Sequence, residues 1–363
     1  MTFSTTDRDA MARALALAEK GLATTTPNPR VGCVITRDGA IVGEGWHRRA
    51  GEPHAEILAL TAAGDAACGA TAYVTLEPCA HFGRTPPCAD ALIAAGVSRV
   101  VAAMEDPNPK VAGRGLDKLR SADIDADCGL LAAEARELNI GFISRMTRNR
   151  PWLRLKVAAT LDGKTALENG VSQWITGTEA RADGHRWRAR ACAVLTAIGT
   201  VKADDPQLTV RDHPCERQPL RILLDPQLEV DPVARILQGA PALIVTAVAD
   251  NAPRARQLAD SGHSILTLPS PDGRVDLPAL MHELAARELN EIHIEAGATL
   301  NGALLAAGCV DELLLYLAPM IAGNTARGLF DLPALTTLDE AQRFEIRECV
   351  RVGRDLRVVA RAG

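Results

Sequence analysis

Short strand-like runs alternate with helical segments along most of the chain, and this alternation limits the possible folds more than any other feature. Residues 31–36 and 41–46 are rich in apolar β-formers and flank Asp38-Gly39, a dipeptide that supplies the positive φ angles of a tight hairpin turn. Helical spacing then alternates with further strand-like runs, which is typical of a sheet covered by helices. The sequence therefore predicts an α/β fold.

The chain has 363 residues, more than one hydrophobic core usually accommodates, so we expect two domains. Residues 146–151 (Met-Thr-Arg-Asn-Arg-Pro) are charged, contain proline and are poor in large apolar side chains, as is typical of a linker. We place the boundary there, with a first domain over residues 1–148 and a second over residues 149–363. The second half repeats the α/β pattern, with strands expected at residues 152–158, 193–198, 220–224, 243–246, 264–268, 291–295 and 312–317.

The composition disfavours several classes of partner. Lys plus Arg number 40 against 45 Asp plus Glu, and aromatic residues are 3% of the chain, so neither charge nor stacking rings favour nucleic acid. The chain contains no run of roughly 18 apolar residues and begins without an apolar signal-peptide segment, so we expect a cytoplasmic protein with no membrane partner. Nine cysteines form an odd set without disulfide-like spacing, and most should be reduced.

The sharpest chemical signal is a set of possible zinc ligands in the first half. His54 lies in Pro-His-Ala-Glu, and Cys79 and Cys88 each follow a proline. One imidazole and two thiolates suit Zn²⁺, and three protein ligands leave the fourth tetrahedral position open to water, as a catalytic site requires. Glu56, two residues after His54, is close enough to exchange a proton with that water without binding the metal. The pattern indicates a zinc-dependent hydrolytic deaminase.

Two alternatives remain open for the same residues. Cys79 and Cys88 are separated by eight residues, more than in the nucleobase deaminases, and the insert carries His81. If His81 supplied a fourth ligand, the site would be closed and would belong to a non-enzymatic, zinc-stabilised module. The other alternative is an RNA or nucleotide deaminase with an unrelated second domain, which the acidic, aromatic-poor composition disfavours.

The chain closely resembles the bifunctional riboflavin-biosynthesis deaminase/reductase family. The matching segments, spread over nearly the whole chain, are Pro-Asn-Pro-Arg-Val-Gly (27–32), Gly-Glu-Pro-His-Ala-Glu (51–56), Thr-Leu-Glu-Pro-Cys (75–79), Gly-Arg-Thr-Pro-Pro-Cys (83–88), Asp-Pro-Asn-Pro (106–109), Leu-Asp-Gly-Lys (161–164), Ser-Gln-Trp-Ile-Thr (172–176), Ala-Asp-Asp-Pro (203–206) and Glu-Ala-Gly (295–297). The long insert before Cys88 separates this family from cytidine and tRNA adenosine deaminases. The resemblance implies a cytidine-deaminase-like α/β/α domain followed by a dihydrofolate-reductase-like α/β domain.

The resemblance also implies two successive reactions on a small phosphorylated pyrimidine. The first domain would remove the ring amino group of 2,5-diamino-6-ribosylamino-4(3H)-pyrimidinone 5′-phosphate by zinc-dependent hydrolysis. The second would use NADPH to reduce the ribosyl group to a ribityl side chain. Glu56 would be the catalytic proton shuttle beside one Zn²⁺ held by the three ligands named above. The resemblance also implies that Asn28, His47 and Arg84 contact this substrate. The chemistry agrees, because an asparagine amide can hydrogen-bond to the edge of a pyrimidinone and cationic side chains suit a phosphate.

The residues of the second half say less by themselves. No Gly-x-Gly-x-x-Gly follows a strand, and residues 295–302 fit either a plain strand-to-helix turn or a helix start whose free N–H groups bind a pyrophosphate. The resemblance favours the second interpretation and implies NADPH contacts at Ala158, Trp174, Thr200, Asp204, Gly297, Ala298, Thr299, Leu300, Asn301, Gly302 and Ala303. It implies substrate contacts at Ser172, Arg188, Leu208, Arg211 and Glu295.

Three expectations complete the prediction for the second half. Arg188 and Arg211 suit a substrate phosphate, because the guanidinium fork binds it through two hydrogen bonds. Lys156 on the first strand is a possible catalytic residue that donates a proton or orients the hydride site. Ala296 replaces a frequent glycine of the family, which affects the geometry of the phosphate turn. For the assembly, we expect a homo-oligomer, either a dimer or a tetramer.

Overall fold

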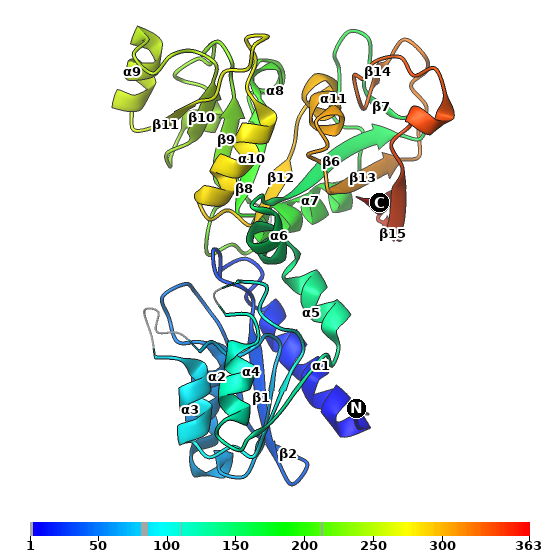
Figure 1. The fold of residues 1–363 in the computed structure, drawn as a ribbon. Helices are drawn as coiled ribbons and strands as arrows, with labels where there is room; N and C mark the ends of the chain where they lie inside the picture. The colour runs from blue at the N-terminus through cyan, green and yellow to red at the C-terminus, as the bar shows by residue number, and fades with distance from the viewer. Residues whose placement is uncertain (1–2, 81–85, 110, 212) are drawn as a thin grey trace. The chain divides into compact units, whose positions relative to one another are not determined.

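The computed structural model describes residues 3–80, 86–109, 111–211 and 213–363 (Figure 1). It divides the chain into two compact units, Met1–Asn149 and Arg150–Gly363. Helix α6 (Ile140–Arg148) includes residues 146–148, so the segment predicted to be a linker is helical over its first half. Among the described residues, we find no helix with both the length and the apolar character needed to cross a membrane.

The first unit contains a mixed five-stranded sheet in the order β2-β1-β3-β4-β5. The first two strands form the predicted antiparallel hairpin, and its turn residues Asp38 and Gly39 have φ angles of 51° and 79°. Strand β3 pairs antiparallel with β1 and parallel with β4, which pairs parallel with β5. The strands are β1 (Gly32–Arg37), β2 (Ala40–Trp46), β3 (Thr71–Val74), β4 (Arg99–Ala102) and β5 (Asp125–Cys128).

Helices cover both faces of this sheet. Successive strand residues point to opposite sides, and apolar residues at both kinds of position give each face a core to bury. Cys33 and Ile35 of β1 pack in one core with the first group of helices, whereas Val34 between them packs in a second core with the other group. The first group is α2 (Ala55–Ala63), α3 (Cys88–Ala94) and α4 (Arg114–Arg120), and the second is α1 (Thr5–Glu19) and α5 (Ala132–Leu138). The short 3₁₀ helix η1 (Gly64–Ala67) follows α2. The predicted α/β/α architecture is confirmed.

Two glycines of β2 bring the start of α2 close to the sheet. A Cβ on Gly45 would lie 2.3 Å from the carbonyl oxygen of Ala55, and one on Gly43 would lie 2.2 Å from that of Ala59. No side chain fits at either position, so the absence of Cβ allows the helix backbone to rest directly on the strand. This close packing fixes the position of Glu56, which follows Ala55.

The second unit is built on a nine-stranded sheet in the order β11-β10-β9-β8-β12-β6-β13-β16-β15. All neighbours from β11 to β13 are parallel, and the last two strands add antiparallel pairs. The strands are β6 (Trp152–Thr160), β8 (Ala193–Ala197), β9 (Leu220–Leu224), β10 (Leu243–Thr246), β11 (Ser264–Thr267), β12 (Glu291–Ile294), β13 (Glu312–Ala318), β15 (Phe344–Val352) and β16 (Asp355–Ala362). A separate small ribbon pairs β7 (Lys164–Ala166) with β14 (Arg327–Gly328).

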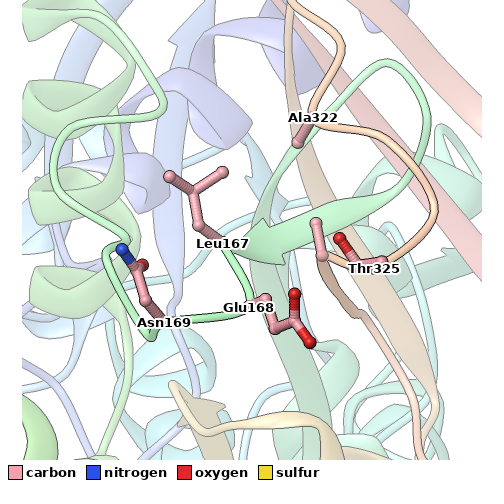
Figure 2. A pocket seen from close by; sticks show the side chains of 6 residues that line it. Leu167, Glu168, Asn169, Ala322 and Thr325 are labelled. Atoms are coloured by element: carbon pink, nitrogen blue, oxygen red, sulfur yellow. The ribbon is translucent and has the colours of Figure 1, made fainter.

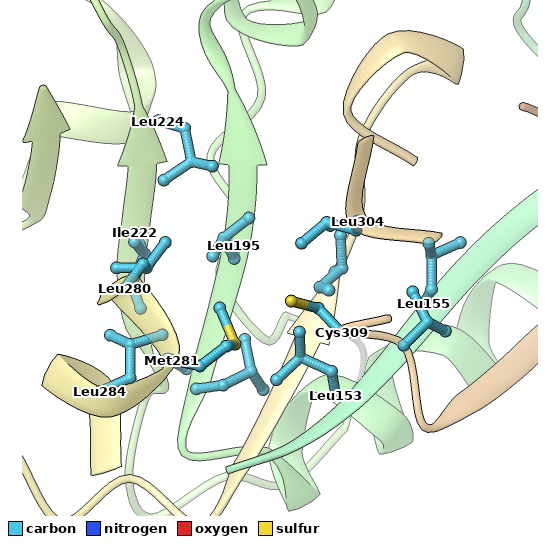
Figure 3. Close-up of a cluster of buried hydrophobic side chains, with 14 of the residues drawn as sticks. Leu153, Leu155, Leu195, Ile222, Leu224, Leu280, Met281, Leu284, Leu304 and Cys309 are labelled. Atoms are coloured by element: carbon cyan, nitrogen blue, oxygen red, sulfur yellow. The ribbon is translucent and has the colours of Figure 1, made fainter. Parts of the chain in front are cut away.

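Helices also lie on both faces of the second sheet. On one face, Leu280, Met281 and Leu284 of α10 pack against Leu195 and Ile222 in the largest apolar cluster (Figure 3). On the other face, α8 and α9 share a cluster with β8 to β10, and α7 shares one with β13 and β16. The helices are α7 (Thr178–Arg190), α8 (Ile198–Asp204), α9 (Pro253–Asp260), α10 (Leu277–Ala286) and α11 (Ala298–Ala306), with 3₁₀ helices η2 (Arg235–Leu237) and η3 (Leu338–Glu340).

Candidate functional site

The three predicted zinc ligands meet where two helices of the first unit begin. His54 is the residue that precedes α2, Cys88 is the first residue of α3, and Cys79 lies in the loop after β3. Their donor atoms all lie within 4.8 Å of one another, and they are the only such group of three among the described His, Cys, Asp and Glu side chains. The structure thus brings together residues that are up to 34 positions apart.

The distances within this group fit a zinc ion. His54 Nδ1 lies 3.3 Å from Cys88 Sγ and 3.7 Å from Cys79 Sγ. Typical Zn–N and Zn–S bond lengths with tetrahedral angles place such donor atoms about 3.5 Å apart. The Cys88 N–H also donates to Cys79 Sγ over 3.3 Å, which favours the thiolate form of that side chain. Hydrogen bonds from Cys88 and His54 lower the pKa of Cys79, although burial opposes the shift.

Glu56 is next to this group but belongs to the first turn of α2. Its side chain is 3% exposed. Burial raises the pKa of Glu56 to about 7, although the neighbouring His54 opposes the shift. A carboxyl group with such a pKa can take up and release a proton near neutral pH, as a general acid–base catalyst must.

Asn28 and His47 form a hydrogen-bonded pair beside the ligand group. Asn28 Nδ2 lies 3.0 Å from His47 Nε2, and His47 Nδ1 lies 3.2 Å from the carbonyl oxygen of Pro53. A carbonyl can only accept, so the ring carries its proton on Nδ1 and accepts from Asn28 at Nε2. Burial lowers the pKa of His47, which favours this neutral form. The ring centroids of His47 and His54 are 5.2 Å apart. Arg84 and His81, which the sequence analysis also names, lie outside the described residues.

In the second unit, three predicted residues meet beside the carboxyl end of β12. Glu295 follows β12, Lys156 lies on β6 and Arg188 lies near the end of α7. Arg188 donates to both carboxylate oxygens of Glu295, with Nη2 3.0 Å from Oε2, and Lys156 Nζ lies 3.6 Å from Oε2. Burial disfavours ionisation of Glu295, but Arg188 and Lys156 outweigh it and hold its pKa well below the usual value. In open parallel sheets, ligands bind at this edge.

Ser172 and Trp174 lie in the loop between β7 and α7. Both line a cavity of about 120 Å³ together with Thr160 and Lys164. Trp174 is 66% exposed, and the Arg181 guanidinium lies 4.6 Å from its ring centroid. A second hollow of about 420 Å³ lies between the same loop and the loop after β13, and Figure 2 shows its lining: Leu167, Glu168, Asn169, Ala322, Thr325 and Ala326.

The predicted phosphate turn is the start of α11. Gly297 precedes the helix, and within the described part of the chain no side chain caps it and no atom lies within 4 Å of a Cβ placed there. The first N–H groups of a helix have no intrahelical partner, so Ala298, Thr299 and Leu300 offer donors at an open surface. This arrangement fits a dinucleotide pyrophosphate. Asn301 instead donates its amide to two backbone carbonyls, and a Cβ on Gly302 would lie 1.9 Å from a backbone oxygen of Asp331.

The other predicted contacts are dispersed around the same sheet edge. Ala158 lies on β6 and Ala303 on α11, whereas Thr200 and the exposed Asp204 lie on α8. Leu208 is buried and has a positive φ of 54°. Arg211 is exposed, and its guanidinium lies 3.4 Å from Gln207 Oε1.

The sequence analysis missed two buried polar residues next to these sites. Glu77 accepts four backbone hydrogen bonds directly before Pro78 and Cys79. His293 is fully buried on β12, with Nε2 3.4 Å from Glu295 Oε1. The position of Glu77 in Glu-Pro-Cys was an available signal for the first, but His293 has no local sequence signal that distinguishes it from an ordinary strand residue.

Comparison with known proteins gives two matches that divide the chain in the same way. Residues 4–104 match the cytidine and deoxycytidylate deaminase zinc-binding region, and residues 151–358 match the RibD C-terminal domain. Riboflavin biosynthesis protein RibD of Escherichia coli (strain K12) is 52% identical over 358 residues, which are 95% of this chain and 96% of the relative. RibD of Aquifex aeolicus is 43% identical over 96% of this chain and 97% of the relative.

Two solved structures cover both units. Acinetobacter baumannii RibD, form 1, superposes with a TM-score of 0.91 at 41% identity and covers 99% of each chain. A diaminohydroxyphosphoribosylaminopyrimidine deaminase/5-amino-6-(5-phosphoribosylamino)uracil reductase from Thermotoga maritima superposes with a TM-score of 0.87 at 33% identity, again over 99% of each chain.

Fold and ligand group together define a zinc-dependent deaminase joined to a reductase with a dihydrofolate-reductase-like fold. The chain belongs to the RibD family, the bifunctional deaminases and reductases of riboflavin biosynthesis. The predicted fold classes, enzyme classes and cofactors, zinc and NADPH, are therefore confirmed, and the substrate is a small molecule.

Proposed function

We propose that the chain deaminates 2,5-diamino-6-ribosylamino-4(3H)-pyrimidinone 5′-phosphate and then reduces the ribosyl group of the product with NADPH. Deamination is assigned to the domain over residues 1–148 and reduction to the domain over residues 149–363. The single observation that carries the proposal is the group of His54, Cys79 and Cys88 beside Glu56. The Thermotoga maritima relative, which covers both units, is a diaminohydroxyphosphoribosylaminopyrimidine deaminase and a 5-amino-6-(5-phosphoribosylamino)uracil reductase, which supports the substrate and the order of the reactions.

In the first unit, the proposed ligands are His54, Cys79 and Cys88. Zinc held there supplies a Lewis acid that makes water a stronger nucleophile near neutral pH. The Glu56 carboxylate takes a proton from the attacking water and passes it to the ring nitrogen and then to the departing amine. The burial of Glu56 directly beside the three proposed ligands supports this transfer, because it keeps the carboxyl group close to the water that zinc would activate.

Asn28 and His47 are the residues proposed to recognise the pyrimidinone ring. The amide of Asn28 has a carbonyl oxygen and a second N–H beyond the bond to His47, so it can pair with both an N–H and a C=O of the ring edge. The neutral His47 holds that amide in one orientation and adds no positive charge beside the metal. Arg84, outside the described residues, is the proposed partner of the 5′-phosphate in this site.

In the second unit, NADPH supplies the hydride, and the protein orients the nicotinamide against the sugar. Lys156 Nζ would give a proton to the sugar ring oxygen as C1′ takes up the hydride and its bond to that oxygen opens. Glu295 supports this role because its carboxylate holds Lys156 and Arg188 at the strand edge. The open start of α11 supports a pyrophosphate contact at Gly297 to Leu300.

The remaining predicted contacts keep their proposed roles. NADPH is assigned to Ala158, Trp174, Thr200, Asp204, Asn301, Gly302 and Ala303, and the phosphorylated substrate to Ser172, Arg188, Leu208, Arg211 and Glu295. A cytoplasmic location is supported by the acidic composition without long apolar runs. The dimer or tetramer stays a prediction, which sedimentation of the full chain tests.

The test of the proposed function uses the full chain with the diaminopyrimidine substrate, with and without NADPH. We expect ammonia release in both cases and loss of the nicotinamide absorbance only after deamination. NADPH oxidation on the diamino substrate without ammonia release would overturn the proposed order of the two reactions. Absence of both signals from the zinc-loaded chain would overturn the substrate.

A further inference from the structure

Glu77 is a buried carboxylate that accepts hydrogen bonds from four backbone N–H groups of one segment, residues 106–116. Its side chain is 3% exposed. Each carboxylate oxygen accepts two of these hydrogen bonds, so all four lone-pair positions are occupied by backbone N–H groups. Oε1 accepts from Gly115 at 2.7 Å and Leu116 at 3.3 Å, and Oε2 accepts from Gly113 at 2.9 Å and Asp106 at 3.1 Å.

The backbone at residues 113–116 is shaped to reach this carboxylate. Gly113 has a φ of +80°, a conformation that favours glycine. A Cβ on Gly115 would lie 1.9 Å from the carbonyl oxygen of Pro78 and 3.1 Å from Glu77 Oε1. The Gly-Arg-Gly string at 113–115, which lacks the pattern of a dinucleotide motif, therefore has a local purpose: it allows the segment to close over Glu77 and Pro78.

Glu77 is two residues before the proposed zinc ligand Cys79, with only Pro78 between them. The φ angle of Pro78 is fixed by its ring, so the backbone between Glu77 and Cys79 has little freedom to rotate. The position of Glu77 therefore restricts the position of Cys79. On its other side, Cys79 is held by the start of α3: its Sγ accepts from Cys88 N at 3.3 Å, and its carbonyl oxygen accepts from Ala89 N at 3.1 Å. Cys79 is thus held between α3 and the segment that Glu77 binds.

We propose that Glu77 is a positioning residue for the zinc site, which fastens Asp106 and residues 113–116 to the loop after β3 and so holds Cys79 Sγ where it ligates zinc. The inference rests on the proposed role of Cys79 in the deaminase. Because coupling between two sites is reciprocal, zinc binding and the order of Asp106 and residues 113–116 stabilise each other. A residue with a purely structural role would stabilise the fold without this link.

The substitution Glu77→Gln tests the proposal with almost no change in volume. A carboxylate has two acceptor oxygens, whereas an amide has one acceptor oxygen and one NH₂ donor group. In the glutamine variant, two of the four backbone N–H groups would therefore face the NH₂ group and lose their acceptor. The matched control is Glu105→Gln, an exposed glutamate next to Asp106. Both full-length variants are loaded with zinc, and the rate of zinc transfer to a chromogenic chelator is measured together with kcat and KM for ammonia release and NADPH binding by the second unit.

We expect Glu77→Gln to release zinc at least tenfold faster than the wild type. Its kcat for ammonia release should fall, while its KM for the pyrimidine stays within twofold of the wild-type value. Glu105→Gln should match the wild type in all three quantities. NADPH binding should be unchanged in both variants. Zinc release at the wild-type rate from a less stable Glu77→Gln protein would overturn the proposal, because Glu77 would then stabilise the fold only. A wild-type chain that binds no zinc would overturn both this inference and the proposed deaminase.

A second measurement on the wild type applies even where the variant fails to fold. Amide hydrogen exchange is followed at Asp106, Gly113, Gly115 and Leu116 with zinc bound and after chelation. We expect at least tenfold faster exchange at these four amides after chelation, with the amides of β12 unaffected. Equal exchange in the two states would overturn the coupling between Glu77 and the metal site.

Discussion

The Glu295 carboxylate lies 3.6 Å from Lys156 Nζ, and the two residues come from adjacent parallel strands of the second unit. Arg188 completes the group with hydrogen bonds to both oxygens of the same carboxylate. Two cations that would otherwise repel each other are therefore held at one sheet edge by a single partly buried anion. This arrangement makes Glu295 the organising residue of the proposed reduction site.

Replacing Glu295 by Gln should separate the two activities. Loss of the negative charge removes the anion that holds Lys156 and loosens Arg188, which keeps its bond to the carbonyl oxygen of Thr209, so Lys156 no longer stays in place for the substrate. We expect NADPH oxidation to fall about 100-fold, the range typical of a displaced proton donor, with ammonia release unchanged. Steady-state assays of both products measure this. Glu288→Gln, an exposed glutamate of the same unit, is the control, and an unaffected reduction rate in Glu295→Gln would contradict the assignment.

The pair of Asn28 and His47 gives a prediction for substrate binding. Asn28→Ala removes the proposed partner of the pyrimidinone edge and leaves His47 Nε2 without its donor. A buried polar group left unpaired costs about 1–3 kcal/mol, so we expect kcat/KM for deamination to fall about 10- to 100-fold. The measurement is ammonia release across substrate concentrations, with reduction of the deaminated intermediate as the internal control. A kcat/KM equal to that of the wild type would remove Asn28 from the substrate site.

Asp7 predicts how the stability of the first unit depends on pH. Burial opposes its ionisation, but hydrogen bonds from Tyr73, Ser4 and Arg99 outweigh burial and lower the pKa to about 2, from the ordinary value of 3.8. Arg99 also pairs with Asp127 on the neighbouring strand. A folded-state pKa below the unfolded value stabilises the fold above about pH 4, and this contribution is lost as the pH falls towards 2.

The corresponding variant is Asp7→Asn. We expect it to be less stable than the wild type by on the order of 2 kcal/mol at pH 7, with the difference shrinking between about pH 4 and pH 2. Hydrogen exchange of the β3 and β4 amides measures the free energy of opening at each pH. Asp9→Asn, at an exposed position of the same helix, should match the wild type throughout. A constant difference for Asp7→Asn across this range would contradict the role of the ionised carboxylate.

The close packing of α2 on β2 predicts a strong effect of a single methyl group. In Gly45→Ala the new Cβ would lie 2.3 Å from the backbone oxygen of Ala55, so α2 must shift and carry Glu56 with it. We expect a loss of about 1–3 kcal/mol in stability, as for other overpacked sites, together with loss of ammonia release. Gly39→Ala, in the exposed hairpin turn with φ +79° and open space around it, should cost about 1 kcal/mol and keep the activity. Equal activities of the two variants would contradict this packing argument.

The grouping of His54, Cys79 and Cys88 was predictable because the chemistry proposed for it is local in the sequence. The motif of His54 and Glu56 and the two Pro-Cys pairs indicate the type and spacing of the ligands directly. The fold only has to bring these side chains together. The hairpin at Asp38-Gly39 was predictable for the same reason, since a tight turn depends on the residues within it. Glu77 was not, because its four partners lie 29 to 39 residues away and are backbone groups with no side-chain signature.

Helix α6 and the strand pair β15 and β16 show how exposed charge conceals secondary structure. Residues 146–148 were predicted to be linker, but Arg145 and Arg148 lie in α6 and Arg148 Nη2 donates to Ser144 within the helix. Strands β15 and β16 were not predicted, although apolar and charged residues alternate along residues 344–352. Most of β15 is exposed at the sheet edge, and its pairing depends on β16 rather than on burial of its own side chains.

The variant Glu56→Gln tests the central claim most directly, because it changes only the proposed proton carrier beside the three proposed zinc ligands. With substrate supplied to the zinc-loaded chain, we predict that ammonia release is abolished while bound zinc stays at one ion per chain and NADPH oxidation on the deaminated intermediate continues at the wild-type rate. Ammonia release that persists at the wild-type rate in this variant would contradict the account.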